Sequence, residues 1–76
     1  MSGETDVVQE LVAVQLGAVS VSAEDRIVED LGAESMDIVN IIAAVEERYG
    51  IHVEESLLPD ISTVNDLISL VQRLRS

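Results

Sequence analysis

Hydrophobic residues recur at spacings of three and four in three stretches of the chain, and this period predicts three amphipathic helices. The first predicted helix covers roughly residues 4–16, and Gly17 is placed to end it in the left-handed conformation. Its hydrophobic positions are Val7, Val8, Leu11, Val12 and Val14.

The second predicted helix has the clearest pattern. We expect it to begin near Ser35 and to end at Tyr49, with Gly50 as the stop. One continuous hydrophobic stripe predicts the side that packs in the core: Ile38, Ile41, Ile42, Val45 and Tyr49.

The last predicted helix runs from about Val64 to Leu74. Thr63 with Asp66 three residues later is typical of a helix start, and two arginines suit the negative end of the helix dipole. The hydrophobic stripe of this helix is Val64, Leu67, Ile68, Val71 and Leu74.

The connections between these helices are expected to be irregular. Residues 18–32 begin with the alternation "AVSV", which has no second strand to pair with, so we expect a loop with at most one helical turn, capped by the side chain of Ser22. Pro59 limits the next connection to a single turn over Ser56–Asp60. The predicted fold is therefore all-α, one domain over residues 1–76, built as a small antiparallel bundle of three longer helices plus a short helical turn.

Length and composition argue against catalysis by this chain alone. Its 76 residues allow one core but no enclosed active-site cleft besides. Tyr49 is the single aromatic residue, expected in the core with its hydroxyl at the surface, so no aromatic-walled cofactor pocket is predicted. The absence of cysteine excludes a disulfide or thiolate metal site, and His52 alone gives no metal-ligand spacing, so no metal site is expected.

The charge of the chain is strongly unbalanced. Fifteen acidic against four basic residues give a net charge of -11, which repels nucleic acid and anionic lipid surfaces and attracts proteins with basic patches. No hydrophobic run approaches membrane-spanning length, and the first residues lack a signal-peptide pattern. We therefore expect a cytoplasmic monomer with no nucleic-acid partner and no membrane insertion.

Ser35 stands out in "DLGAESMDIVNII", residues 30–42, between two carboxylates and just ahead of a helix. As a catalytic nucleophile it would need a general base, but His52 lies beyond the far end of the same helix, at a rise of about 1.5 Å per residue. Ser35 can instead be a helix cap, or an attachment point for a phosphodiester, which the positive end of the helix would favour.

A second hydrophobic strip adjoins the core stripe of the same helix and is rimmed by polar and acidic residues. This arrangement is typical of a docking surface for basic partners. The strip consists of Met36, Val39 and Ala43, and its rim of Asp37, Asn40 and Glu47.

The segment "EDLGAESMDIVNIIAAVEERYGI", residues 29–51, resembles the signature region of acyl carrier proteins. In that family a D-L-G-x-D-S-L pattern surrounds a serine that receives 4'-phosphopantetheine from coenzyme A. The order of helix, long loop, signature helix, short turn and final helix is similar to the family's over nearly the whole chain. The resemblance implies that Ser35 is the attachment site, that a separate phosphopantetheinyl transferase modifies it, and that the protein is not an enzyme but holds acyl groups as thioesters on the arm.

The resemblance also implies roles for residues around Ser35. Asp30, Leu31 and Gly32 match the family's lead-in to the serine. The transferase, acyl-loading enzymes and ketosynthases with basic patches would meet Glu34, Met36, Asp37, Asn40, Ala43, Glu46 and Glu47. An acyl chain folded back between the helices would be lined by Ile42, Val45, Ile61 and Ile68, although plain core packing explains these four equally well.

Some positions depart from the family pattern. Glu34 stands where the family usually has Asp, Met36 where it has Leu, and Asn40 at a position that is commonly acidic. These departures indicate a specialised bacterial carrier that serves fatty-acid or polyketide-type enzymes. Two alternatives stay open: an aminoacyl carrier, either D-alanyl or peptidyl, and a non-carrier helical interaction module in which Ser35 is only a cap.

Overall fold

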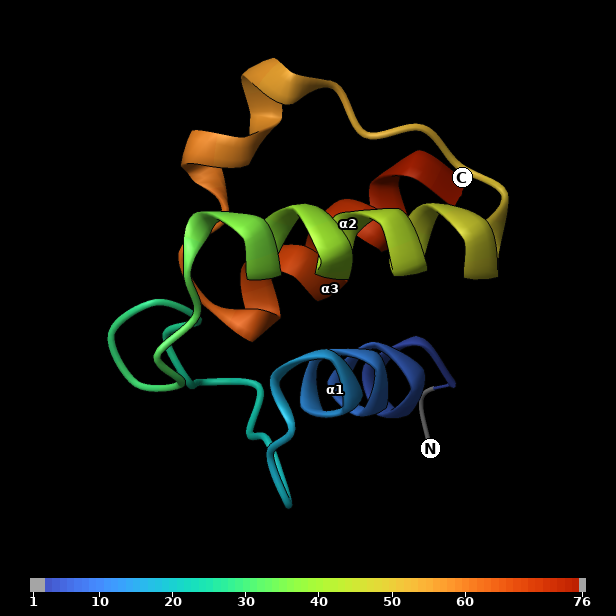
Figure 1. The fold of residues 1–76 in the computed structure, drawn as a ribbon. Coiled ribbons are helices and arrows are strands. Elements are labelled where there is room, and N and C mark those ends of the chain that lie inside the picture. The colour runs from blue at the N-terminus through green and yellow to red at the C-terminus, as the bar shows by residue number, and fades with distance from the viewer. Residues whose placement is uncertain (1–2, 76) are drawn as a thin grey trace.

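The computed structural model describes residues 3–75, and the described residues form helices without a strand. The helices are α1 (Gly3–Leu16), α2 (Ser35–Tyr49) and α3 (Val64–Arg75), with a short 3-10 helix, η1 (Glu55–Asp60), between the last two (Figure 1). The all-α prediction and the order of its elements are confirmed. None of the described helices is long and apolar enough to cross a membrane.

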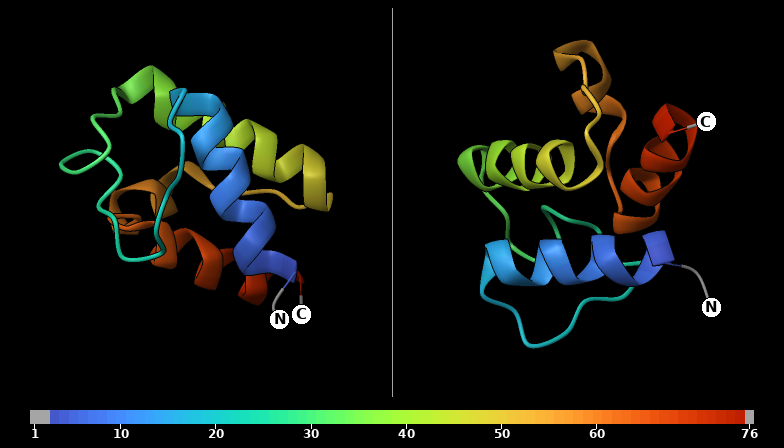
Figure 2. Two further views of the ribbon diagram at one scale, coloured as in Figure 1. Left: turned by 90° about the horizontal axis from the view of Figure 1, so that it is seen from below. Right: turned by 90° about the vertical axis from the view of Figure 1, so that its right-hand side faces the viewer.

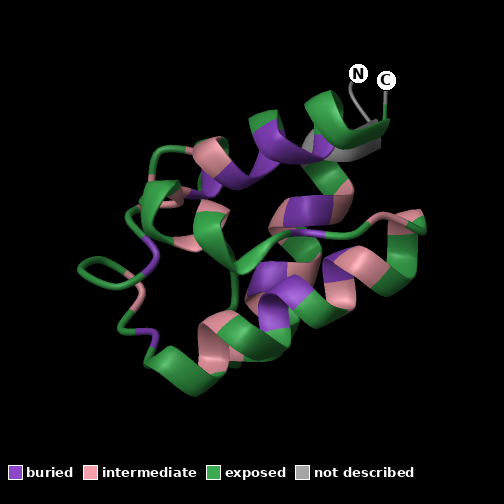
Figure 3. Cartoon of the chain, turned by 90° about the horizontal axis from the view of Figure 1, so that it is seen from above, coloured by how far each residue is buried: buried purple, intermediate pink, exposed green. Residues whose placement is uncertain are grey.

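The three long helices pack around one shared core. α1 contacts both α2 and α3, while η1 lies on the side of α2 and α3 that is turned away from α1 (Figures 1 and 2). The buried residues of the helices lie on the sides that face one another (Figure 3), and Ile27, Ala33 and Val53 are buried in the connections. The fully buried side chains are Ile41, Leu67, Val8, Val12, Val45, Val64 and Val71.

Two predicted stripe positions are exposed, while Val7 is only half-buried. Val14 is 69% exposed, because it lies about 200° around α1 from the buried Val12 and so faces away from the other helices. Leu74 is 37% exposed at the end of α3, where no later described segment covers it. Leu70, which the predicted stripe omitted, is buried three residues after Leu67 and widens the apolar face of α3.

The start of α3 is capped as the sequence indicated. The Asp66 carboxylate accepts the backbone N–H groups of Ser62 and Thr63, both at 3.0 Å, and the Thr63 hydroxyl oxygen accepts the Asp66 N–H at 3.1 Å. These reciprocal hydrogen bonds satisfy donors that a helix start leaves open. They fix where the chain turns from η1 into α3.

In the loop after α1, the turn at Ser22 is capped by a different side chain from the one predicted. The Asp25 carboxylate accepts the Ser22 N–H at 2.9 Å, and the Asp25 N–H donates to the Ser22 carbonyl at 3.1 Å. The prediction that the Ser22 side chain caps a turn is therefore wrong, because the longer Asp25 side chain reaches back to the free N–H instead.

Tyr49 also departs from its prediction. Its hydroxyl is buried and has no hydrogen-bond partner among the described residues, so it does not reach the surface. The guanidinium groups of Arg48 and Arg75 cover the ring, at 5.4 Å and 4.9 Å from its centroid. These cation–π contacts add to the packing of the half-buried ring.

Candidate functional site

The loop that leads to Ser35 is tied to the start of α3. The Ile27 N–H donates to the Ser62 carbonyl at 2.9 Å, and the Val64 N–H donates to the Asp25 carbonyl at 3.0 Å. Between these bonds, Arg26 and Thr63 form an isolated antiparallel bridge. Although the loop has no regular secondary structure, this pairing holds it in one place.

An ion pair closes the turn just ahead of the serine. The Arg26 guanidinium donates to both carboxylate oxygens of Asp30, each at 3.2 Å, and the Arg26 backbone N–H donates to Asp30 Oδ2 at 2.9 Å. These hydrogen bonds from Arg26 lower the pKa of Asp30 below its usual value, and the same pair raises the pKa of Arg26. Sequence reasoning missed Arg26, although a basic residue four positions before the motif's Asp is a visible signal.

The other residues between Asp30 and Ser35 also have structural roles in this turn. Leu31 packs against the core. Gly32 has φ +72°, a left-handed backbone conformation that residues other than Gly adopt only at an energetic cost. Ala33 is buried and its N–H donates to the Ile27 carbonyl at 3.1 Å. The D-L-G residues therefore shape the turn that brings the chain to the surface immediately before Ser35.

Ser35 is the first residue of α2 and not its cap. Glu34 occupies the N-cap position: its backbone is extended, with φ -97° and ψ 172°, and its carbonyl accepts the Ile38 N–H at 3.1 Å. The Asp37 carboxylate accepts the Glu34 N–H at 2.9 Å. The hypothesis that Ser35 serves only as a helix cap is therefore wrong, because its neighbours perform that role.

The Ser35 side chain is exposed at the N-terminus of α2, and no described residue forms a hydrogen bond with its hydroxyl. The first-turn N–H groups and the helix dipole favour an anion at this end. His52 is held at Glu46, in the fourth turn of α2, so no described imidazole activates the serine. The Ser35 hydroxyl is therefore presented at the surface of the protein.

The residues predicted to meet partners share one accessible side of α2. Met36 is 67% exposed and Val39 49%, so the apolar strip is open to solvent. Exposed together with Met36 are Glu34, Asn40, Ala43 and Glu47, whereas Asp37 and Glu46 are half-buried. This face continues directly from Ser35 along the helix.

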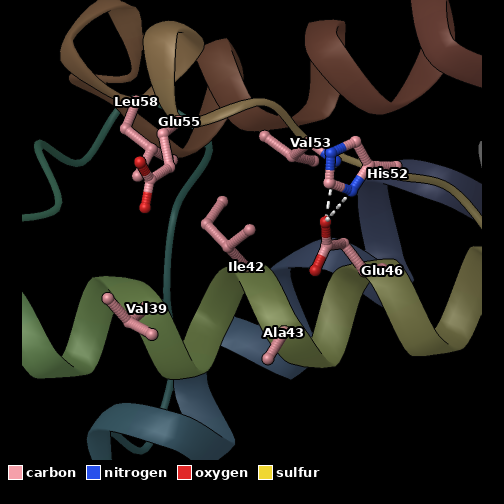
Figure 4. A pocket seen from close by; sticks show the side chains of 8 residues that line it. All are labelled: Val39, Ile42, Ala43, Glu46, His52, Val53, Glu55 and Leu58. Carbon is pink, nitrogen blue, oxygen red and sulfur yellow. Dashed lines mark hydrogen bonds and ion pairs between the residues drawn. The ribbon is translucent and has the colours of Figure 1, made fainter.

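A pocket of about 230 Å³ lies between α2 and the η1 region (Figure 4). Val39, Ile42 and Ala43 form its side on α2, and Val53 and Leu58 face them from the other side. The polar lining residues are Glu46, His52 and Glu55. The pocket is thus apolar inside with ionisable groups around it.

Glu46 holds the loop that forms one wall of this pocket. Its Oε2 accepts the Val53 N–H at 2.7 Å and lies 3.4 Å from His52 Nδ1, while its own carbonyl accepts the N–H groups of Gly50 and Ile51 (Figure 4). Because Val53 is buried, the Glu46 carboxylate is what satisfies its N–H. We call this arrangement of Glu46, His52 and Val53 the Glu46 latch.

The predicted acyl-lining residues are only partly brought together at this pocket. Ile42 lines it, whereas Val45 and Ile68 are buried in the core and Ile61 packs against that core. Val39 and Ala43, predicted as docking residues, line the pocket too. Sequence reasoning missed Leu58, for which an apolar side chain in a short turn next to Pro59 was the available signal, and it also missed Val53 in the loop before η1.

Comparison with known proteins places this site in context. A family model described as "Phosphopantetheine attachment site" matches residues 6–71. The chain is 35% identical over 69 residues to an acyl carrier protein of Campylobacter hominis, covering 91% of this chain and 85% of the relative.

Two further relatives show similar coverage. An acyl carrier protein of Helicobacter pylori is 36% identical over 67 residues, 86% of each chain. One of Thermotoga maritima is 32% identical over 68 residues, which is 87% of this chain and 84% of the relative. A helical bundle, an exposed serine at a helix start and similarity over most of the length therefore agree, and the chain belongs to the acyl carrier protein family, whose shared domain is the phosphopantetheine attachment site.

Proposed function

We propose that Ser35 carries a 4'-phosphopantetheine arm and that the protein holds acyl groups on it as thioesters. The observation that carries this proposal is the exposed Ser35 side chain at the N-terminus of α2, whose hydroxyl has no hydrogen-bond partner among residues 3–75, inside a chain that matches the attachment-site family. The residues present fit the group, because the helix N-terminus favours its phosphate and the Ser35 side chain is exposed. When bound, the arm supplies a terminal thiol, which the cysteine-free chain itself lacks.

Ser35 acts here as an acceptor and not as a catalyst. Its Oγ forms a bond to the phosphorus next to pantetheine in coenzyme A, the diphosphate P–O bond breaks, and the adenosine bisphosphate part leaves. The hydroxyl proton passes to a base of the transferase, since no described residue of this chain is placed to take it. The Arg26–Asp30 ion pair and Gly32 support the turn that keeps Ser35 accessible to that enzyme.

The accessible side of α2 is the surface that partner proteins would recognise. Met36 offers an apolar contact, and Glu34 and Glu47 offer negative charge to either side of it. We expect the transferase, acyl-loading enzymes and ketosynthases to dock there through basic patches, because opposite charge speeds encounter and fixes orientation. A cytoplasmic monomer remains the prediction for the free protein. The hydrophobic pocket between α2 and η1 supports an acyl cargo over an aminoacyl one.

Intact-mass measurement tests the proposal. Incubation with a broad-specificity phosphopantetheinyl transferase and coenzyme A should add one phosphopantetheine to the wild-type chain and none to Ser35→Ala. Ser56→Ala is the matched control, since Ser56 is also exposed but lies in η1, and it should be modified like the wild type. An unchanged wild-type mass, or a mass increase that persists in Ser35→Ala, would contradict the proposal.

A further inference from the structure

We infer that Arg26 is a specificity-determining residue for the partners that act on Ser35. By pairing with Asp30, it reduces the negative charge of the loop that leads to the serine, so that basic partners dock along α2 instead. This inference rests on the proposed carrier function and adds the side from which partners approach.

Basic residues are distributed very unevenly along the chain. Arg26 is the only Lys or Arg among residues 1–47, which contain eleven of the fifteen acidic residues. The other arginines are Arg48 in the last turn of α2 and Arg73 and Arg75 in the last turn of α3, where positive charge suits the helix dipole. Arg26 lies in a loop, so the dipole of a helix does not account for its charge.

The backbone around Arg26 forms most of the turn, independently of the side chain. The Asp30 and Leu31 N–H groups donate to the Arg26 carbonyl at 2.8 Å and 3.1 Å, and the Arg26 N–H donates to Asp30 Oδ2 at 2.9 Å. Any residue except proline at position 26 can form these bonds. The guanidinium adds an ion pair between two exposed side chains, a contact that contributes little to stability. What the arginine adds is therefore mainly its charge.

The ion pair and the accessible side of α2 lie in opposite directions from the start of that helix. The loop extends beyond the start of α2, whereas the helix runs the other way (Figures 1 and 2). On the loop, Arg26 pairs with Asp30, and its charge also interacts with that of Glu29. Glu34 at the cap of α2 and Glu47 near its end are exposed and form no ion pair within the part of the chain that the structure describes. The α2 side keeps its negative charge, while that of the loop is reduced.

A basic partner responds to this difference between the two sides. Opposite charges speed encounter and fix orientation, and specificity is gained where a competing arrangement is made less favourable. Without the Arg26 guanidinium, Asp30 would still be ionised at neutral pH and would make the loop a second attractive side. Arg26 therefore disfavours partners, and docking orientations, that place their basic groups on the loop.

Four variants separate the local charge of Arg26 from its other effects. Arg26→Gln uncovers the Asp30 carboxylate, whereas Arg26→Lys keeps the positive charge. Arg26→Gln/Asp30→Asn removes both charges and so keeps the net charge of the wild type, and the asparagine oxygen can still accept the backbone N–H of residue 26. Arg73→Gln is the matched control, because it removes an exposed arginine from the end of α3 and changes the net charge as Arg26→Gln does.

The experiment maps where a transferase docks. The isotope-labelled chain is titrated at low salt with a broad-specificity phosphopantetheinyl transferase, without coenzyme A, and backbone amide NMR shifts give the footprint and the dissociation constant. In the wild type we expect shifts at Met36 and Glu47 on α2 and little change at Glu29 and Leu31. In Arg26→Gln the last two should shift as well, and the dissociation constant should fall by about two- to fivefold, the size of one exposed charge contact. High salt should remove this difference.

The controls decide between local charge, overall charge and folding. Arg26→Lys, Arg73→Gln and Arg26→Gln/Asp30→Asn should all leave the loop outside the footprint, and the melting temperature of Arg26→Gln should stay close to that of the wild type. A footprint confined to α2 in Arg26→Gln, an equal gain in affinity in Arg73→Gln, or a loop footprint that persists in the double variant would overturn the inference. A clear fall in the melting temperature of Arg26→Gln would overturn it too, because the side chain would then serve the fold.

Failure of the proposed function would look different. It would appear as the absence of any mass increase when coenzyme A is supplied. The docking footprint is recorded without coenzyme A, so it tests the role of Arg26 independently of that result, and a wild type with no footprint on α2 would itself overturn the inference.

Discussion

At the scale of single residues, Asp66 is the clearest example of a side chain whose charge contributes to stability. Its carboxylate accepts the Thr63 and Ser62 N–H groups, and these hydrogen bonds lower its pKa below the usual 3.8. A carboxylate with a lowered pKa in the folded state stabilises the protein above its unfolded pKa. That contribution is lost as the pH falls through the lowered value.

We therefore expect Asp66→Ala to destabilise the protein at pH 7 by about 1 kcal/mol, the usual effect of losing a helix cap, and to lower the melting temperature by about 4–8 °C. The difference from the wild type should begin to shrink below about pH 3.8 and should shrink further as the pH falls through the lowered pKa of Asp66, where the carboxylate of the folded wild type becomes protonated. Thermal unfolding followed by circular dichroism at a series of pH values measures both effects.

Asp60→Ala is the matched control, because it removes an equal charge from an exposed residue at the end of η1. It should leave the melting temperature nearly unchanged at pH 7. A loss in Asp66→Ala that is the same at every pH would show that the charged hydrogen bonds are not its source.

At the scale of elements, the connection between α2 and η1 depends on one side chain. The Glu46 carboxylate accepts the buried Val53 N–H at 2.7 Å, and the loop forms a wall of the pocket. Hydrogen bonds to a charged group contribute about 1.5–3 kcal/mol, so we expect Glu46→Ala to speed amide exchange at Val53 by at least about tenfold. Hydrogen exchange followed by NMR measures this on the unmodified chain.

Two variants test whether faster exchange at Val53 comes from the lost Glu46 hydrogen bond or from a general change in charge. Glu47→Ala removes a neighbouring acid that is exposed and does not line the pocket, and it should leave exchange at Val53 unchanged. Glu46→Gln should lie between Glu46→Ala and the wild type, since a neutral acceptor forms a weaker bond. If Val53 exchanges at the wild-type rate in Glu46→Ala, the wall is held by something other than this carboxylate.

At the scale of the whole molecule, the acidic excess opposes folding. The net charge is -11, and the dimensions are only 30 × 29 × 18 Å. The screening length falls from about 30 Å at 0.01 M salt to about 10 Å at 0.1 M, so added salt removes repulsion across the molecule. We expect the melting temperature to rise with sodium chloride over this range, which differential scanning fluorimetry or calorimetry can follow.

The salt effect should come from screening and not from the kind of cation. Choline chloride at equal ionic strength is the control, and it should give a similar rise. A melting temperature that stays flat or falls with both salts would show that the acidic groups are too far apart to destabilise the fold.

Much of the helical framework could be predicted because its signals are local. The bounds of α2 follow from its hydrophobic period and from Gly50, which has φ +66° as a C-cap. The start of α3 follows from Thr63 and Asp66, whose side chains bond to the backbone a few positions away. Val14 was misplaced because it follows Leu11 by three positions, which fits the helical period, although it lies on the other side of the helix from the buried Val12.

The sequence by itself determined the helices, the acidic charge and the motif around Ser35, because each depends on residues that are close together in the chain. The tertiary structure decided that the loop before Ser35 is tied to Ser62 and Val64, and that Val39 and Leu58 face one pocket. These pairs are separated by many positions, so no period in the sequence relates them. They come together only when the helices pack and bring distant backbone groups and side chains into contact.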